Sequence, residues 1–394
     1  MKALRNYLDK IKPNFEEGGK LHAFQSLFDG LETFAFVPRT TSREGSVNIH
    51  DAIDSKRIMS LVVIALMPAL LFGMYNVGYQ NALAAGKLAD ATCWSMFLYG
   101  FLAVLPKIVV SYVVGLGIEF VVAQWKHEEI QEGFLVSGIL IPMIVPVTTP
   151  LWMLAIAVAL SVILAKECFG GTGMNIFNPA LVTRAFLFFS YPAAMTGDNT
   201  IWVKAEQILG VGYDVTNADA LSAATPLGQA AEAGFAGFDP QTITDAITGL
   251  IPGSVGETSV IAIALGALLL LLTGVASWKT MLSVFVGGAF TGWLMQTLGL
   301  TEIQWYEHLV LGGFCFGAVF MATDPVTSAR TEGGKYIYGL LIGLVAVMVR
   351  VLNPGYPEGM MLAILLMNLF APLIDYCFVQ RNINMRAKRA ANNK

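Results

Sequence analysis

Two apolar stretches of this chain repeat each other with the same residues at the same spacing. A glutamate, a glycine, a threonine and a proline lie at offsets 0, 6, 16 and 18 in both, as Glu132, Gly138, Thr148, Pro150 and as Glu307, Gly313, Thr323, Pro325. A second echo pairs residues 174–179 with 367–372, and a fainter third pairs Lys107, Ser111, Gly115 with Lys279, Ser283, Gly287; all keep the same order in both halves. A duplicated apolar unit with Gly and Pro interrupting its helices is typical of transporter-like folds with a site between the repeats.

The composition predicts an all-α polytopic membrane protein. Hydrophobic residues make up 55% of the 394 residues and charged residues 13%, whereas soluble domains carry about 25% charged residues. Runs that approach or exceed the roughly 20 apolar residues needed to cross a bilayer lie at 58–78, 96–122, 134–149, 151–167, 179–195, 259–277, 281–298, 308–322, 336–352 and 359–379. The third and eighth runs are short and rich in Gly, Pro and Thr, which predicts broken or re-entrant segments.

Ten crossings divide into two units of five, and an odd number per unit requires the second to be inverted relative to the first. We therefore expect about ten transmembrane helices in two inverted five-helix repeats, as in urea transporters. With both termini in the cytoplasm, most of the 24 Lys and Arg residues lie inside, as the positive-inside rule requires. The expected segments are a cytoplasmic extension (1–56), the first repeat (57–195), an extracytoplasmic loop (196–257), the second repeat (258–380) and a basic cytoplasmic tail (381–394).

The two polar segments each allow two interpretations. The extension of residues 1–56 is either a capping or partner-docking arm or a lid over a cytoplasmic pocket. The acidic loop of residues 196–257 is far longer than most connections, and such loops generally have a function or form small subdomains; the alternative is a solvated cap. The four cysteines and four histidines follow no metal-binding spacing, so no metal site beyond sodium is expected in this chain alone.

A short run of small residues in the acidic loop contains a threonine six positions after an aspartate. Considered only as a turn, residues 219–225 place Asp219 or Ser222 as the cap of a nearby helix. The run also resembles the flavin-attachment motif Asp-Gly-x-Ser-Gly-Ala-Thr, in which a transferase esterifies the Thr hydroxyl with the phosphate of FMN. Thr225 is the corresponding acceptor, although Ala220 and Ala223 replace the two glycines.

Together with this motif, residues 166–173, 178–181, 184–189 and 321–325 and the polar extension resemble the family of B subunits of sodium-translocating NADH:quinone oxidoreductases over nearly the whole chain. The resemblance implies one component of a bacterial inner-membrane translocase. It implies covalent FMN at the outer face, a noncovalent riboflavin nearer the cytoplasm, and a ubiquinone site on the cytoplasmic side. Partners would be an NADH-oxidising flavoprotein subunit, a second covalent-FMN subunit and small membrane subunits; no nucleic-acid partner is expected.

Two groups of residues are candidates for the riboflavin and quinone sites. The stretch 170–179 breaks a helix and offers the amides of Asn175 and Asn178, which suit the edge of an isoalloxazine ring; the alternative is that they only satisfy the broken helix. Gly115 and Gly117 leave room for a flat ring near Glu119, and the family ties this region to quinone binding. The alternative for Glu119 is a side chain that reaches to water at the membrane surface.

The candidate sodium pathway combines two carboxylates and two phenylalanines. An Asp inside the membrane costs about 2.5–3.5 kcal/mol on insertion scales, and a sodium ion bound by oxygen ligands would compensate Asp375 or Asp324. The alternative for Asp375 is an interfacial position near Arg381. Phe316 and Phe320 share one helix face, and they either narrow an ion pathway or simply belong to the core.

The family resemblance, together with the repeat pattern, implies a subunit that passes electrons from covalent FMN through riboflavin to ubiquinone with coupled sodium export. NADH oxidation belongs to another subunit, because this chain has neither a dinucleotide-binding fingerprint nor iron–sulfur cysteine spacing. Two alternatives remain: the related D subunit of the Rnf complex, and a small-solute channel or transporter of the same fold, since a fold alone does not decide function. The long N-terminal extension favours the quinone-reducing complex.

Overall fold

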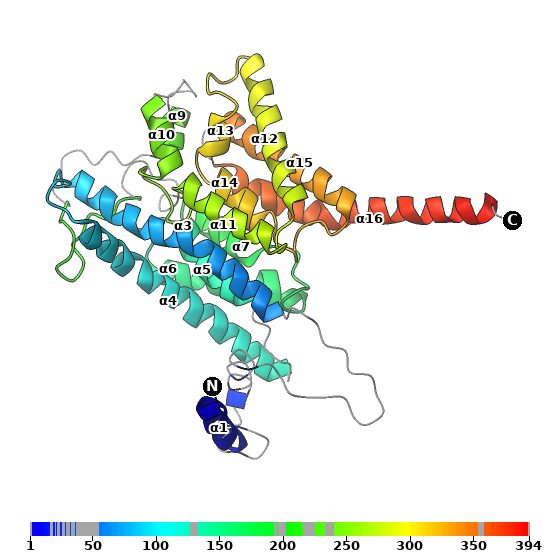
Figure 1. The fold of residues 1–394 in the computed structure, drawn as a ribbon, viewed down its shortest axis with the longest axis horizontal. Helices are drawn as coiled ribbons and strands as arrows, with labels where there is room; N and C mark the ends of the chain where they lie inside the picture. The colour runs from blue at the N-terminus through cyan, green and yellow to red at the C-terminus, as the bar shows by residue number, and fades with distance from the viewer. Residues whose placement is uncertain are drawn as a thin grey trace.

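A computed structural model shows that the chain folds into a bundle of packed helices (Figure 1). The structure describes residues 2–15, 19, 21, 24–25, 28, 32, 36, 55–126, 133–192, 195, 202–215, 225–232, 240–353 and 358–392. These residues contain one isolated β-bridge and otherwise only helices and loops. The helices are α1 (Lys2–Ile11), η1 (Lys12–Asn14), α3 (Ser55–Ala84), α4 (Cys93–Lys126), α5 (Phe134–Ile144), α6 (Leu151–Ser161), η3 (Val162–Lys166), η4 (Glu167–Phe169), α7 (Pro179–Ser190), α9 (Pro226–Glu232), α10 (Pro240–Thr248), α11 (Val260–Leu272), α12 (Trp278–Thr297), α13 (Glu307–Val310), α14 (Phe314–Phe316), η5 (Gly317–Met321), α15 (Glu332–Leu352) and α16 (Met360–Asn392).

Five stretches within the described residues are long and apolar enough to cross a membrane, and α5, α7 and α11 are shorter apolar helices. The five stretches correspond to α3, α4, the continuous segment from α6 to η4, α15 and α16. Many large apolar side chains on these helices remain exposed, which suits a lipid environment. The prediction of an all-α polytopic membrane protein is therefore confirmed.

The third and eighth apolar runs are broken, as their Gly, Pro and Thr content predicted. In the third run α5 ends at Ile144, and an extended segment beginning with Val145 separates it from α6. In the eighth run the chain forms only the short pieces α13, α14 and η5, the last a π-helix. Each break leaves backbone groups without intrahelical partners inside an apolar body, so each needs a substitute partner.

In the first break, the substitute partners come from other elements. The carbonyl of Met143 accepts a 2.8 Å hydrogen bond from the N–H of Gly256. The carbonyl of Pro146 accepts one from the ammonium of Lys107, whose side chain is buried in α4. A loop that precedes α11 and a cation on α4 therefore hold the end of α5 in place.

In the second break, one guanidinium plays the same part. Arg350 lies on α15 with 0% of its surface exposed. It donates to the carbonyl of His308 at 2.6 Å and to the carbonyl of Leu311 at 3.2 Å. Gly312 follows with φ +63°, a backbone conformation that favours glycine. A buried cation thus supports the break in each half of the chain.

The echo between residues 174–179 and 367–372 does not produce equivalent structure. The first copy lies in a non-helical segment before α7, whereas the second is part of the continuous helix α16, with Pro372 inside it. Pro is tolerated within membrane helices where neighbouring groups satisfy the freed backbone. Residues 381–392 also continue α16, which projects away from the other helices (Figure 1).

Glycine allows helices to approach closely in both halves. In the first, the position of a Cβ on Gly100 of α4 would lie 1.7 Å from the carbonyl oxygen of Met74 on α3. In the second, a Cβ on Gly343 of α15 would lie 2.1 Å from the carbonyl oxygen of Val284 on α12. Membrane helices associate largely through such close packing at small residues. These contacts hold together the long helices that surround the two breaks.

We expect Arg350→Met to destabilise the protein, because it leaves two buried carbonyls without a donor at about 1–3 kcal/mol each. The measurement is the thermal unfolding midpoint of the detergent-solubilised protein. Arg386→Met, on the exposed part of α16, is the matched control and should leave the midpoint unchanged. Equal midpoints for the two variants would contradict the role of Arg350 in supporting the break.

Candidate functional site

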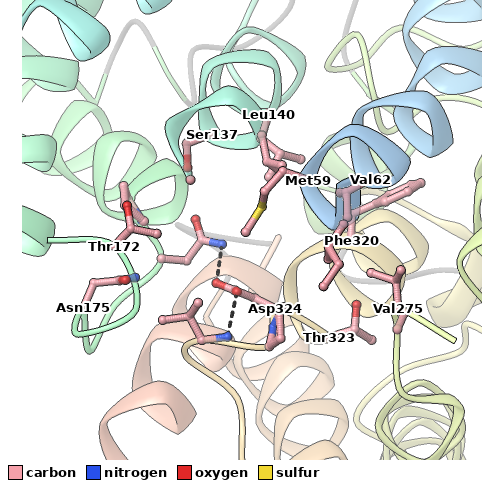
Figure 2. Close-up of a pocket in the computed structure, with 18 of the residues that line it drawn as sticks. Met59, Val62, Ser137, Leu140, Thr172, Asn175, Val275, Phe320, Thr323 and Asp324 are labelled. Atoms are coloured by element: carbon pink, nitrogen blue, oxygen red, sulfur yellow. Dashed lines mark hydrogen bonds between the residues drawn. The ribbon is translucent and has the colours of Figure 1, made fainter. Parts of the chain in front are cut away.

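A cavity of about 80 Å³ lies where the two halves of the chain meet (Figure 2). Segments before and after the acidic loop both contribute to its wall. The first half supplies Ile58, Met59, Val62, Gly133, Val136, Ser137, Leu140, Lys166, Thr172, Asn175, Asn178 and Pro179, and the second half supplies Leu270, Val275, Ala276, Phe320, Thr323, Asp324, Pro325 and Val326. The cavity therefore unites the predicted riboflavin residues with part of the predicted sodium pathway.

The amide of Asn178 joins the two halves at the cavity. Its Nδ2 donates to Asp324 Oδ2 at 3.2 Å, and its Oδ1 accepts from the N–H of Ala180 at 2.9 Å, which caps α7. Asp324 accepts two further bonds, from the N–H of Val326 and the hydroxyl of Thr327, both at 3.0 Å. The predicted riboflavin residue and the predicted sodium residue are thus direct partners.

Asn175 is held within the loop that precedes α7. Its Oδ1 accepts from the N–H of Gly173 at 3.2 Å and its Nδ2 donates to the carbonyl of Phe177 at 3.0 Å. Gly170, Gly171 and Gly173 have φ of +111°, +90° and +92°, so the loop folds in a way that favours glycine. Both predicted amides line the cavity and also satisfy the broken backbone. A riboflavin contact for them remains a prediction.

One ring of the aromatic pair predicted from its spacing lies in the cavity wall. The ring centroids of Phe316 and Phe320 are 5.1 Å apart, and both side chains are buried. Phe320 lines the cavity, whereas Phe316 does not. A Cβ on Gly266 of α11 would lie 2.7 Å from the Phe320 ring and 2.3 Å from the Ala65 carbonyl oxygen of α3. The Phe320 ring therefore packs against Gly266 of α11, close to where α11 contacts α3.

Glu119 is part of a buried ion pair rather than a side chain that reaches water. Its Oε1 accepts from the ammonium of Lys166, and both side chains are 5% exposed. Lys166 is the last residue of η3, a π-helix that continues α6. Sequence patterns assign Lys166 no role beyond its place in the family resemblance, yet its side chain is buried and lines the cavity.

The two glycines predicted to make room for quinone have different surroundings. A Cβ on Gly115 would lie 2.0 Å from the Phe134 ring of α5, so the missing side chain is used for packing between α4 and α5. No atom lies within 4 Å of the Cβ position of Gly117. Neither glycine lines the cavity. A quinone role for these positions remains a prediction.

Asp375 caps the beginning of α15 from the neighbouring helix α16. Its Oδ2 accepts from the N–H of Arg330 at 2.7 Å, and its Oδ1 accepts from the N–H and hydroxyl of Thr331 at 2.9 and 2.5 Å. A carboxylate at a helix N-terminus is favoured by the unpaired N–H groups there. These bonds compensate the free-energy cost of placing an aspartate in an apolar run. Asp375 does not line the cavity.

Thr225 immediately precedes α9 in the acidic loop. Its Oγ1 accepts from the N–H of Gly228 at 3.0 Å, and among the described residues no bond donated by this hydroxyl is found. Leu227 is buried, and its Cδ2 lies 2.9 Å from the Cβ position of Gly312. Helix α9, which follows Thr225, therefore packs against Gly312 in the second break. Asp219 and Ser222 lie outside the described residues.

A charged cluster that sequence reasoning missed lies beside the second break. Arg184 on α7 donates to Glu257 at 2.7 Å and also to Glu358. Ser254 donates to the same Glu257 at 2.7 Å. The absence of a side chain on Gly313 lets both carboxylates approach the start of α14. The signal was present in the sequence, because Arg184 is an ionisable residue within an apolar run.

Within the described residues no group of His, Cys, Asp and Glu side chains is arranged to hold a metal ion. Cys93, Cys168 and Cys377 are exposed and Cys315 is buried, all as free thiols. The described part of the site is thus a cavity with amide, carboxylate, ammonium, hydroxyl and aromatic groups. Such a donor set suits a polar organic ring or a small cation more than a transition metal.

The sequence profile of the NQR2, RnfD, RnfE family matches residues 42–384. The chain belongs to this family. Similar curated proteins are each named as the B subunit of a Na(+)-translocating NADH-quinone reductase. The relative from Chromohalobacter salexigens is 44% identical over 98% of this chain and 97% of its own length. Those from Klebsiella pneumoniae and Ectopseudomonas mendocina are each 42% identical over 98% of this chain and 99% of their own.

For this family member we predict that Gly115→Ala lowers the thermal unfolding midpoint, because its methyl group would overlap Phe134 and overpacking costs about 1–3 kcal/mol. Gly117→Ala is the matched control and should leave the midpoint unchanged. The second readout is quinone or inhibitor affinity at constant flavin content. Equal midpoints combined with altered affinity only in Gly115→Ala would favour the quinone role over the packing role.

Proposed function

We propose that this chain is the B subunit of a sodium-translocating NADH:quinone reductase in a bacterial inner membrane. It receives electrons on covalent FMN at Thr225 and passes them through riboflavin to ubiquinone, with coupled sodium export. The observation that carries the proposal is the similarity, over almost the full length of both chains, to relatives named as that subunit. NADH oxidation and a second covalent FMN belong to other subunits of the complex, which also includes small membrane subunits.

The proposed architecture is two inverted five-helix repeats, in which α3 to α7 correspond to α11 to α16. The helix α5 and the pieces α13 to η5 lie at equivalent positions of the two repeats, and each is followed by non-helical chain, which supports this arrangement. Both termini and the extension of residues 1–56 are cytoplasmic, and the tail of residues 381–394 is basic. The loop of residues 196–257, which includes Thr225, is then extracytoplasmic.

The surroundings of Thr225 fit a covalent phosphoester. The hydroxyl oxygen accepts from Gly228, and esterification replaces the hydroxyl hydrogen while this acceptor bond remains. The residue is partly exposed, so a flavin transferase has access to it. The contact between Leu227 and Gly312 holds Thr225, the proposed attachment point, against the second repeat. When bound, FMN supplies the one-electron chemistry that amino-acid side chains lack.

The cavity between the repeats fits the donor set of riboflavin. The amides of Asn175 and Asn178 and the hydroxyl of Thr172 present hydrogen-bonding groups at its wall, and the Phe320 ring offers an apolar face. Its volume of about 80 Å³ is below the roughly 300–1,000 Å³ of pockets for drug-sized ligands. A three-ring flavin therefore enters with movement of lining side chains, of which the unbranched Met59 is the most adaptable.

One continuous segment connects the two proposed flavin sites. Gly312 lies beneath α9, and the chain runs on through α14 and η5 to Phe320 at the cavity. The residues of α14 and η5 span on the order of 12 Å at the helical rise. The proposed quinone residues Gly115, Gly117 and Glu119 lie on α4, and Glu119 reaches the cavity wall through Lys166.

Asp324, Asp375, Phe316 and Phe320 are the proposed residues of the sodium pathway. Asp324 offers carboxylate oxygens at the cavity beside the hydroxyls of Thr323 and Thr327, and oxygen ligands suit a hard cation. The D subunit of the Rnf complex and a solute channel of the same fold are the competing proposals. The family profile also covers Rnf proteins, so the distinction from the Rnf subunit rests on the relatives' names. The flavin test below distinguishes the redox subunit from the solute channel.

We expect Thr225→Val to abolish the in-gel fluorescence of the denatured subunit while the complex still assembles. The substitution keeps the shape of the side chain and removes the hydroxyl, at a capping cost of about 1 kcal/mol. Thr248→Val, which removes a hydroxyl from α10 in the same loop, is the matched control and should remain fluorescent. Fluorescence retained in Thr225→Val would place the attachment elsewhere, and a colourless wild-type chain made with an active transferase would favour a channel.

A second prediction concerns Asp375. We expect Asp375→Ala to raise the sodium concentration that gives half-maximal turnover, because it removes a carboxylate from the proposed uptake path. Thr331→Val removes one hydrogen bond to the same carboxylate and serves as the control for loss of the cap alone. The readout is turnover against sodium concentration in the purified complex. An unchanged sodium dependence in Asp375→Ala would exclude Asp375 from the pathway.

A further inference from the structure

The ion pair between Lys166 and Glu119 is a charged contact at the described cavity wall that the proposed function does not fully use. It links η3 to α4 and is almost completely withdrawn from solvent. Placing both charges in the interior carries a desolvation cost, which a bare pair often fails to recover. A pair kept in such a place therefore suggests a further partner.

Two unsatisfied atoms indicate where that partner lies. Among the described residues, Glu119 Oε2 and Thr172 Oγ1 are buried and have no hydrogen-bond partner. Thr172 lines the cavity together with Lys166, and Figure 2 labels Thr172 among the side chains around it. Buried polar groups are nearly always paired with protein, water or ligand. Both atoms therefore indicate a polar group in or beside this cavity.

The two described π-helices meet the same cavity from opposite halves of the chain. Lys166 ends η3 in the first half, and Phe320 lies within η5 in the second. Single π-helical turns occur frequently at functional sites. One turn thus supplies a cation and the other an aromatic ring, which together suit a flat heteroaromatic ring with hydrogen-bond acceptors at its edge.

We propose that Lys166 contacts the redox ligand of this cavity through its ammonium, and that Glu119 is a positioning residue that holds the ammonium and balances its charge. The identity of that ligand as a flavin rests on the proposed function. An electron added beside a positive charge is stabilised, and one added beside a negative charge is destabilised. The pair therefore sets the reduction potential of the ligand.

The test uses the complete purified complex and measures the midpoint potential of its noncovalent flavin by optical redox titration. Lys166→Met leaves Glu119 unbalanced and should shift the potential to more negative values. Glu119→Gln leaves the ammonium unbalanced and should shift it to more positive values. The double variant carries neither charge and should lie between the two. Arg386→Met, on the exposed part of α16, is the control and should cause no shift.

Opposite shifts in the two single variants support the proposal, because a merely structural role would not reverse sign. Unchanged potentials, or shifts of the same sign, would overturn it. If Lys166→Met fails to assemble, Glu119→Gln and the double variant decide, since the positive shift of the first must disappear in the second. A wild-type complex without extractable noncovalent flavin would instead refute the proposed function, so the two failures are distinguishable.

Discussion

The structure depends on how broken helices satisfy their backbone inside an apolar body. Hydrocarbon offers no hydrogen bonds, so every interrupted turn must find a partner within the protein. Lys107 serves the first break and Arg350 the second, each from a neighbouring helix. Gly256 adds a backbone donor at the end of α5. These contacts stabilise the interruptions, and the interruptions in turn create non-helical backbone at which polar groups from both halves meet.

The proposed chemistry is located at these interruptions. The helix after Thr225 is seated on Gly312 in the second break, and η5 continues from there to the cavity. Asn178 and Asp324 join the two halves by a hydrogen bond at the cavity wall. A flavin attached at one end and another held at the other would be connected by one continuous segment. In the proposed function the fold would provide positioning, and the flavins would provide the redox chemistry.

Sequence patterns predicted the helical class and the two broken runs, because hydropathy and Gly/Pro content act locally. They did not predict the partners of buried charges. Lys166 is 47 residues from Glu119 and Asp375 is 44 residues from Thr331, so these pairs exist only after the helices have packed. The echo between residues 174–179 and 367–372 corresponds to no common structure, because a proline marks only a possible break and packing decides whether the helix continues. The pairing of Asn178 with Asp324, 146 residues apart, required the fold for the same reason.

The most direct test of the account is mass spectrometry of the intact chain purified from cells with an active flavin transferase, followed by peptide mapping. The account predicts a mass increase corresponding to one FMN phosphoester, located on the peptide that contains Thr225. An unmodified Thr225 peptide, or an FMN adduct on a segment from the other face of the membrane, would contradict it.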